Sequence, residues 1–145
     1  MALQVGARVV VLKPNGGRVA GVDAPDLESV ALSRSELAVA GRAALRLFNP
    51  ANGRLRKAIA LGPNATLALA GVTSRLALLQ GAHVLELVRL SDGAIVSLPL
   101  KAMAAKGLLD AKLTKAGLFY AYNVAKGRSK GRIVFERTSR LLARF

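Results

Sequence analysis

The chain contains no cysteine and no tryptophan, and only 4% of its residues are aromatic. The absence of cysteine excludes a disulfide framework, a thiolate metal site and a cysteine nucleophile. Because 52% of the residues are nevertheless hydrophobic, the core must consist mainly of leucine, valine and alanine. This apolar content excludes a disordered chain, and 145 residues are enough for a single domain, residues 1–145, with its own core.

The sequence also has no apolar run that could cross a membrane. Its longest stretch without a charge, from Ala58 to Ser74, contains Gly62, Pro63 and Gly71, which excludes a bilayer-spanning helix. The first ten residues, MALQVGARVV, lack a basic leading segment and a small-residue cleavage site, so we expect no signal peptide in this chain. The compartment stays unknown, since a longer parent protein could be exported.

Acidic residues are scarce: 8 acids stand against 22 lysines and arginines, which gives a formal net charge of +14. From Lys101 onward there are eleven basic residues and two acidic ones, so this third of the chain contributes +9. A basic region of this kind attracts polyanions. It is also typical of a composition that only serves solubility, and both interpretations stay open.

Two stretches of the sequence match each other at one constant spacing along the chain. They are ELAVAGRAALRLF at 36–48 and RLALLQGAHVLELV at 75–88. The Asn-Gly and Asp-Gly turns that follow them are strong hairpin signals, because both residues tolerate the positive φ of a tight turn. Each copy therefore predicts a hairpin. The matched positions are Gly41 and Gly81, Leu45 and Leu85, Leu47 and Leu87, and the turns Asn52-Gly53 and Asp92-Gly93.

A second hairpin is predicted upstream of the first in each copy. The stretches 30–41, 67–81 and 110–123 each have an apolar alternation, a polar break with Ser or Thr, and another alternation. Four short strands in about 40 residues is the period of a β-propeller blade. The predicted strands are 27–32, 36–41, 44–49 and 54–61 in one copy, and 66–72, 75–80, 83–90 and 94–100 in the next.

This period divides the domain into a partial blade at 1–26, blades at 27–64 and 65–102, and a final blade at 107–145. The partial blade has the Asn15-Gly16 turn of a last hairpin and lacks its first two strands, which predicts that upstream blades are missing. The final blade ends with a predicted strand at 131–136 and a stretch, RTSRLLARF, that fits a strand or a short helix.

Two turn regions resemble those of known propellers. The pattern Leu-Ser-x-x-x-Leu-Ala from Leu32 to Ala38 is similar to the turn between the first two strands of a blade, and LTKAGLFYAY from Leu113 to Tyr122 repeats it. On these motifs the chain resembles the C-terminal part, about three and a half blades, of a bacterial β-propeller of the broad WD-repeat and TolB-like class. The resemblance implies a rigid scaffold whose loops bind other proteins.

The expected fold is thus all-β, an array of four-stranded antiparallel blades, with a β-sandwich or barrel as the alternative. A closed propeller needs at least four blades. Three and a half blades leave sheet edges open, and open edges pair readily with other chains. A homodimer through these edges is therefore one possible partner arrangement, beside a separate protein partner.

Catalytic motifs are nearly absent. Gly127 to Gly131 reads Gly-x-Ser-x-Gly, but a nucleophile elbow needs a following helix and a histidine further along, and the only histidine, His83, lies upstream. The acids Asp23 and Asp26, with Glu28, fit turn formation and solvation better than a cation site. No phosphate-binding or dinucleotide motif occurs. We therefore expect no enzyme activity, no cofactor and no metal.

Aromatic and basic residues coincide near the C-terminus, and a positive groove with stacking rings is how single-stranded nucleic acid is held. The same residues also fit a packed aromatic face beside a solvated loop. The sequence predicts a non-catalytic binding scaffold for protein partners; the alternative is binding of a polyanion, such as nucleic acid or an acidic polymer, through the basic C-terminal third. The candidate contact residues are Lys126, Arg128, Lys130, Arg132, Tyr120 and Tyr122.

Overall fold

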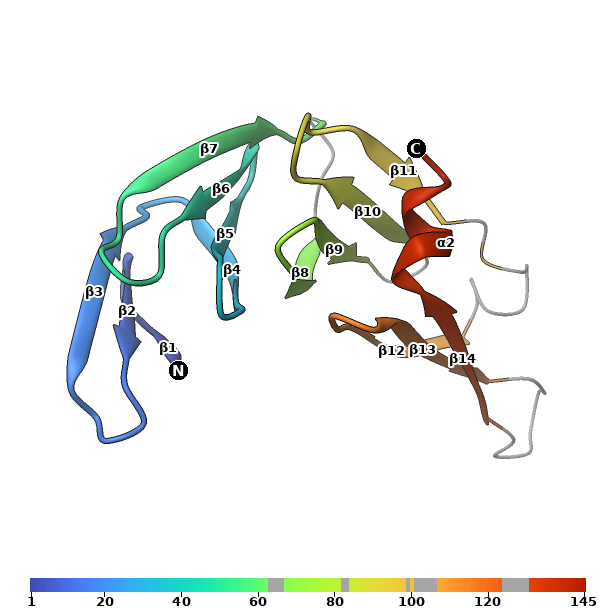
Figure 1. The fold of residues 1–145 in the computed structure, drawn as a ribbon, viewed down its shortest axis with the longest axis horizontal. Helices are drawn as coiled ribbons and strands as arrows, with labels where there is room; N and C mark the ends of the chain where they lie inside the picture. Colours follow the sequence, from blue (N-terminus) through green and yellow to red (C-terminus); the bar gives the residue numbers. More distant parts are fainter. Residues whose placement is uncertain (63–66, 82–83, 99, 101–106, 124–130) are drawn as a thin grey trace.

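Four antiparallel sheets follow one another around an arc, with the first and last sheets at its two ends (Figure 1). This is a computed structural model that describes residues 1–62, 67–81, 84–98, 100, 107–123 and 131–145. Each sheet is a meander in chain order, as expected for blades joined by short turns.

The first sheet contains three strands, the second and third contain four each, and the fourth contains three. In chain order these are β1 (Ala2–Val5), β2 (Arg8–Leu12) and β3 (Arg18–Asp23); β4 (Leu27–Leu32), β5 (Leu37–Gly41), β6 (Ala44–Phe48) and β7 (Leu55–Ala60). The chain continues with β8 (Ala68–Val72), β9 (Leu76–Gln80), β10 (Leu85–Arg89) and β11 (Ile95–Ser97); then β12 (Leu108–Leu113), β13 (Gly117–Asn123) and β14 (Gly131–Arg137), followed by the helix α2 (Thr138–Leu142).

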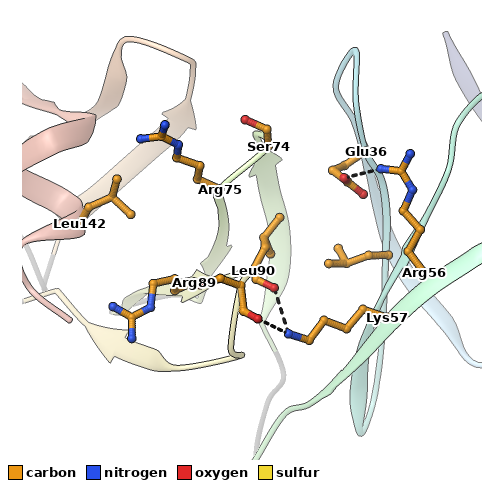
Figure 2. A pocket seen from close by; sticks show the side chains of 10 residues that line it. Glu36, Arg56, Lys57, Ser74, Arg75, Arg89, Leu90 and Leu142 are labelled. Carbon is orange, nitrogen blue, oxygen red and sulfur yellow. Dashed lines mark hydrogen bonds and ion pairs between the residues drawn. The ribbon is translucent and has the colours of Figure 1, made fainter.

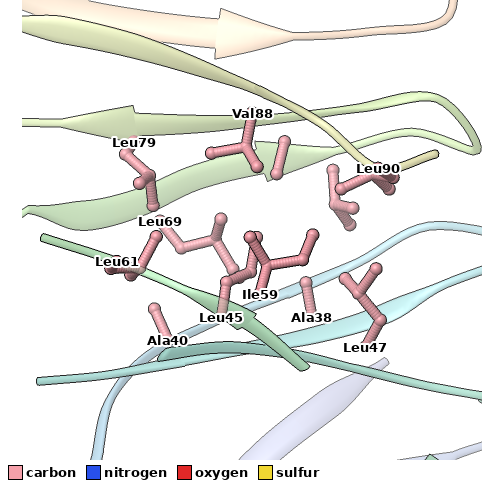
Figure 3. Packing of buried hydrophobic residues seen from close by; sticks show 12 residues of the cluster. Ala38, Ala40, Leu45, Leu47, Ile59, Leu61, Leu69, Leu79, Val88 and Leu90 are labelled. Carbon is pink, nitrogen blue, oxygen red and sulfur yellow. The ribbon is translucent and has the colours of Figure 1, made fainter. Parts of the chain in front are cut away.

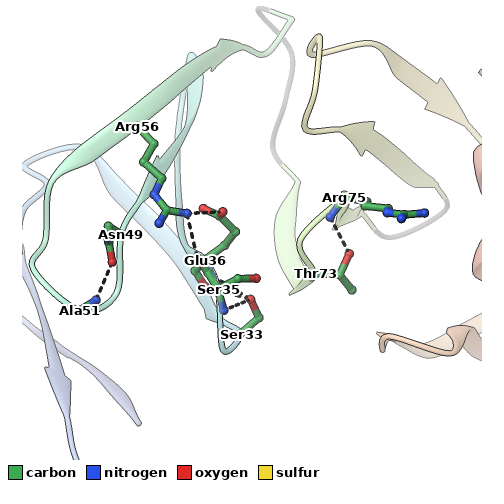
Figure 4. Close-up of polar contacts among 8 residues, drawn as sticks. All are labelled: Ser33, Ser35, Glu36, Asn49, Ala51, Arg56, Thr73 and Arg75. Carbon is green, nitrogen blue, oxygen red and sulfur yellow. Dashed lines mark hydrogen bonds and ion pairs between the residues drawn. The ribbon is translucent and has the colours of Figure 1, made fainter.

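The turn between the first two strands of a sheet is built in the same way in the second, third and fourth sheets. The hydroxyl of Ser33 accepts a hydrogen bond from the amide of Glu36 at 3.0 Å (Figure 4). The hydroxyl of Thr73 accepts one from the amide of Leu76, also at 3.0 Å. The Thr114 hydroxyl accepts the amide three residues further on as well, at 3.3 Å. The polar break seen in the sequence is therefore a side chain that replaces a missing backbone partner.

In the first three sheets, the turn between the last two strands depends on glycine. Gly16, Gly53 and Gly93 have φ values of 82°, 70° and 84°, which is the left-handed region that other residues rarely adopt. The amides of Gly53 and Gly93 close these turns by donating to backbone carbonyls at 2.8 Å. The Asn-Gly and Asp-Gly signals in the sequence thus mark equivalent turns in successive sheets.

The buried Thr73 provides a test of this turn. Replacing it with valine removes one donated and two accepted hydrogen bonds, and we expect the free energy of unfolding to fall by about 1–2 kcal/mol. Chemical denaturation followed by circular dichroism measures the change. The equivalent Ser33→Ala should cost less, because Ser33 is only partly buried. A larger loss in Ser33→Ala than in Thr73→Val would contradict this reasoning.

Three hydrophobic clusters form the core, and each lies between two consecutive sheets. The first joins β2 and β3 to β5, and the last joins β9 and β10 to β12, β13 and α2. The middle cluster is shown in Figure 3. A hydrogen bond from the Leu69 amide in β8 to the Ser29 hydroxyl in β4, at 2.8 Å, also joins the second and third sheets. Members of the middle cluster include Ala38, Ala40, Leu45, Leu47, Ile59, Leu61, Leu69, Leu79, Val88 and Leu90.

The two ends of the chain differ from the sequence-based expectation. The first sheet has a third strand, β1, whose residues Ala2–Val5 pair with β2 from Val5↔Arg8 to Ala2↔Val11. The sequence predicted only the two strands around Asn15-Gly16. At the other end the open choice is resolved as a helix, α2, whose Leu141 is buried against the third and fourth sheets. In the chain this helix follows β14, the third strand of its sheet, whereas in the second and third sheets the third strand is followed by a fourth.

Candidate interaction site on the turn face

One end of the sheets carries all the hydrogen-bonded turns described above, and we call it the turn face. In a meander the first and third turns lie at the same end of the sheet, because successive strands reverse direction. The turn face therefore comprises the inner turns 33–36, 73–76 and 114–117, and the outer turns 13–17, 49–54 and 89–94. The predicted bases at 126–130 lie outside the described residues.

Each inner turn carries one exposed basic residue. These are Arg34, Arg75 and Lys115, and each lies in a turn that the hydroxyl of Ser33, Thr73 or Thr114 closes with the same kind of hydrogen bond. None of the three bases forms an ion pair within the described residues. The inner strands β4, β8 and β12 lie next to one another, so these charges line the inner side of the arc.

The acids on this face are already neutralised by other arginines. Glu36 receives a hydrogen bond from Arg56 at 2.8 Å, and Asp92 receives one from the Arg89 Nε at 2.9 Å. The hydrogen bonds from Arg89 lower the pKa of the Asp92 carboxyl, and the same bonds raise the pKa of Arg89. The three inner-turn bases therefore give the face a surplus of positive charge.

A cavity of about 480 Å³ opens between the second and third sheets beside these turns (Figure 2). Arg75 and Arg89 line it from the third sheet, Glu36 and Lys57 from the second, and Leu142 from α2. Figure 2 shows the guanidinium groups of both arginines on the side of α2. The remaining lining residues are Leu47, Arg56, Ser74, Leu90 and Ser91.

The polar groups of the cavity are held in place by specific contacts. The Lys57 ammonium donates to the carbonyl of Leu90 at 3.1 Å and to that of Ser91 at 2.6 Å, which ties the two sheets together. The Arg89 guanidinium lies 4.9 Å from the centre of the Phe145 ring, a cation–π distance. The Glu36 Oε2 atom is buried and has no hydrogen-bond partner among the described residues. Arg75 is thus a cation of this cavity without an acidic partner among the described residues, whereas Arg56 and Arg89 are paired.

The predicted contact residues at the C-terminus are distributed over different environments. Tyr120 and Tyr122 share a face of β13, as predicted, with ring centres 6.3 Å apart. Tyr122 is only 6% exposed, and Tyr120 packs against the cluster between the third and fourth sheets, where burial raises its pKa. Tyr122 is thus buried, whereas Tyr120 is partly exposed. Arg132 is exposed, whereas Lys126, Arg128 and Lys130 lie outside the described residues.

The three acids weighed as a cation site each pair with a different arginine. Asp23 lies 3.2 Å from Arg8, and the Glu28 carboxylate lies 3.5 Å from Arg42. Asp26 accepts two hydrogen bonds from Arg46, and these bonds lower the pKa of Asp26. Within the described part of the chain, no group of three or more possible metal ligands is found. His83 lies outside that part.

Reasoning from the sequence missed the turn-face bases because it looked for charge runs. Arg34, Arg75 and Lys115 stand in three successive repeats, so no local window contains two of them. Their signal is periodic: each follows the Ser or Thr of an inner turn by one or two positions. Aligning the three turns would have found them. Among the described residues, no helix is long and apolar enough to cross a membrane.

The comparisons with known proteins identify a fold. No family model and no curated protein matches the sequence. Among solved structures, BamB from Moraxella catarrhalis superposes with a TM-score of 0.60 at 13% identity, covering 84% of this chain and 40% of that chain. A eukaryotic initiation factor gives a TM-score of 0.48 at 14% identity, covering 95% of this chain and 38% of the other. The chain spans well under half of BamB, and it has a β-propeller-like fold in the form of an arc of four sheets.

Proposed function

We propose that this chain is a non-catalytic protein-binding module of the β-propeller type, and that it binds an acidic segment of a partner protein on its turn face. The observation that carries the proposal is the set of three inner-turn bases, Arg34, Arg75 and Lys115, without acidic partners among the described residues. Loops on a rigid scaffold are where binding residues concentrate.

The hydrogen bonds of the inner turns support this role. The hydroxyls of Ser33 and Thr73 fix the turns before any partner arrives, so little conformational entropy is lost on binding. The positive surplus attracts an acidic partner over a distance and raises the association rate. The cavity beside Arg75 and Arg89 is large enough for one or two side chains, and its bases suit a carboxylate.

The test measures binding of a fluorescently labelled acidic peptide, rich in Glu and Leu, by fluorescence anisotropy. In Arg34→Glu/Arg75→Glu we expect the Kd to rise at least about tenfold, or about 1.4 kcal/mol. The matched control, Arg42→Glu/Arg132→Glu, changes the net charge by the same amount at the opposite end of the sheets. It should stay within a factor of about two, because charge complementarity acts mainly within a Debye length.

Equal losses in both double variants would refute the proposal, because binding would then depend only on net charge. A peptide with Gln in place of each Glu should bind poorly to every variant. A labelled single-stranded oligonucleotide is measured in parallel. If it outcompetes the peptide and loses affinity mainly in Arg42→Glu/Arg132→Glu, polyanion binding at the opposite end replaces the proposed function.

A further inference from the structure

The two end sheets of the arc each have one face that no other sheet covers. On the fourth sheet, Phe119 and Phe135 stack with ring centres 4.5 Å apart, and Ile133 is 75% exposed. Their strand neighbour Leu118 is buried against the third sheet, so these side chains point away from it. On the first sheet, Val5 is 63% exposed, on the face opposite the buried strand residues.

Exposed large hydrophobic residues are concentrated on these end sheets. Nine are found in the described chain, and only Leu55 and Ile95 lie on the two middle sheets. Apolar side chains gathered on one sheet face are characteristic of an interaction surface. The other seven are Met1, Leu3, Val5, Leu109, Phe119, Ile133 and Phe135.

The two free faces are unlike halves of one kind of interface. Each sheet has a forward face, toward the next sheet in the chain, and a backward face, toward the preceding sheet. In each of the three core clusters, the forward face of one sheet packs on the backward face of the next. The free face of the fourth sheet is a forward face, and the free face of the first sheet is a backward face. Pairing them continues the arrangement already used three times inside the chain.

From this geometry we infer that two copies of the chain associate head to tail, with the fourth sheet of each copy packed on the first sheet of the other. Head-to-tail contacts close into a ring when the rotation allows it. Two arcs of four sheets give eight, within the usual range of four to eight blades for a propeller. The interface lies between sheet faces, in contrast to the edge pairing that the sequence suggested.

The length of the structural neighbour supports a partner of this size. The BamB alignment covers 84% of this chain but 40% of the other, so the BamB chain is about twice as long as this one. Two copies therefore supply about as many residues as one chain of that propeller-fold neighbour. A single copy leaves the exposed apolar side chains of both end sheets in water, which is unfavourable.

The first measurement is the molar mass of the intact chain by sedimentation equilibrium over a wide range of concentrations. We expect a dimer, with twice the 15.1 kDa mass of one chain. Ile133→Lys and Val5→Lys should each shift the mass to that of a monomer. The control Leu55→Lys, at a residue that is 56% exposed on the second sheet, should remain a dimer. Circular dichroism checks that every variant is folded.

Mixing the two monomeric variants distinguishes head-to-tail pairing from other dimers. In a ring of one Ile133→Lys copy and one Val5→Lys copy, both substitutions fall in one interface and the other interface is unchanged. The mixture should therefore form dimers, with weaker association than the native chain. A native chain that stays monomeric, a substitution that matters on only one end sheet, or a mass that grows without limit would overturn the inference. None of these outcomes depends on peptide binding at the turn face.

Discussion

Replacing Leu78 with alanine is expected to lower the free energy of unfolding by about 3 kcal/mol, and replacing its neighbour Leu79 should cost about as much. Adjacent residues of a strand point to opposite faces of the sheet. Leu78 belongs to the cluster between the third and fourth sheets, and Leu79 belongs to the cluster between the second and third. Both side chains are fully buried, so each substitution leaves a cavity in a different interface.

Equilibrium unfolding in urea measures the stability of both variants. A suitable control is Leu55→Ala in β7, whose side chain is exposed, and we expect it to change stability by less than about 0.5 kcal/mol. The double variant Leu78→Ala/Leu79→Ala should cost more than either single change, since the two side chains pack in different interfaces. A negligible effect at Leu78 would mean that the fourth sheet does not pack on the third.

Gly117→Ala is the second substitution with a large expected effect, about 3 kcal/mol. A Cβ atom at this position would lie 2.0 Å from the backbone oxygen of Glu136 and 2.8 Å from the ring of Phe135. The Glu136 oxygen is part of the main chain of β14 and cannot rotate away. The two strands must therefore separate, which disturbs the pairing of β13 with β14.

The matched control is Gly131→Ala, at the other end of the same strand pair. The nearest atom to a Cβ there is the backbone oxygen of Tyr122 at 3.9 Å, an ordinary van der Waals contact. We expect its midpoint of thermal unfolding to stay near that of the native chain, whereas that of Gly117→Ala falls by several degrees. Equal behaviour of the two variants in a thermal melt would show that the close approach of β13 and β14 at Gly117 is absent in solution.

Local sequence signals predicted much of the fold. The internal repeat aligned Ser33 with Thr73, and Gly53 with Gly93, and each pair proves to form equivalent turns. These signals work because a turn depends on a few consecutive residues: a hydroxyl three positions before an amide, or a glycine at positive φ. The all-β, propeller-like fold follows from them and agrees with the structural likeness to BamB.

The ends of the chain were harder to predict, for a physical reason. Strand β1 is short and carries weak alternation, and it forms because β2 offers it a pairing edge. Helix α2 has five residues, too few to be stable alone, and it is held by the burial of Leu141. Both elements depend on contacts with other parts of the chain, which a local pattern does not contain.

The candidate site likewise depends on contacts between distant parts of the chain. Attention to charge density placed it at residues 120–132, where Tyr122 proves to be buried and Arg132 exposed. The bases of the turn face were hidden because each stands alone in its own repeat. Only the stacking of the inner strands β4, β8 and β12 brings them to one side of the molecule.

By itself, the sequence determined the strand periods, the turns and the excess of positive charge, since each of these follows from the order of neighbouring residues. The tertiary structure decided which charges meet. It neutralised Glu36 with Arg56, left Arg34 and Arg75 without acidic partners among the described residues, and opened a cavity between two sheets. It also decided that both faces of the middle sheets are covered and one face of each end sheet is not, because packing joins residues that belong to different repeats of the chain.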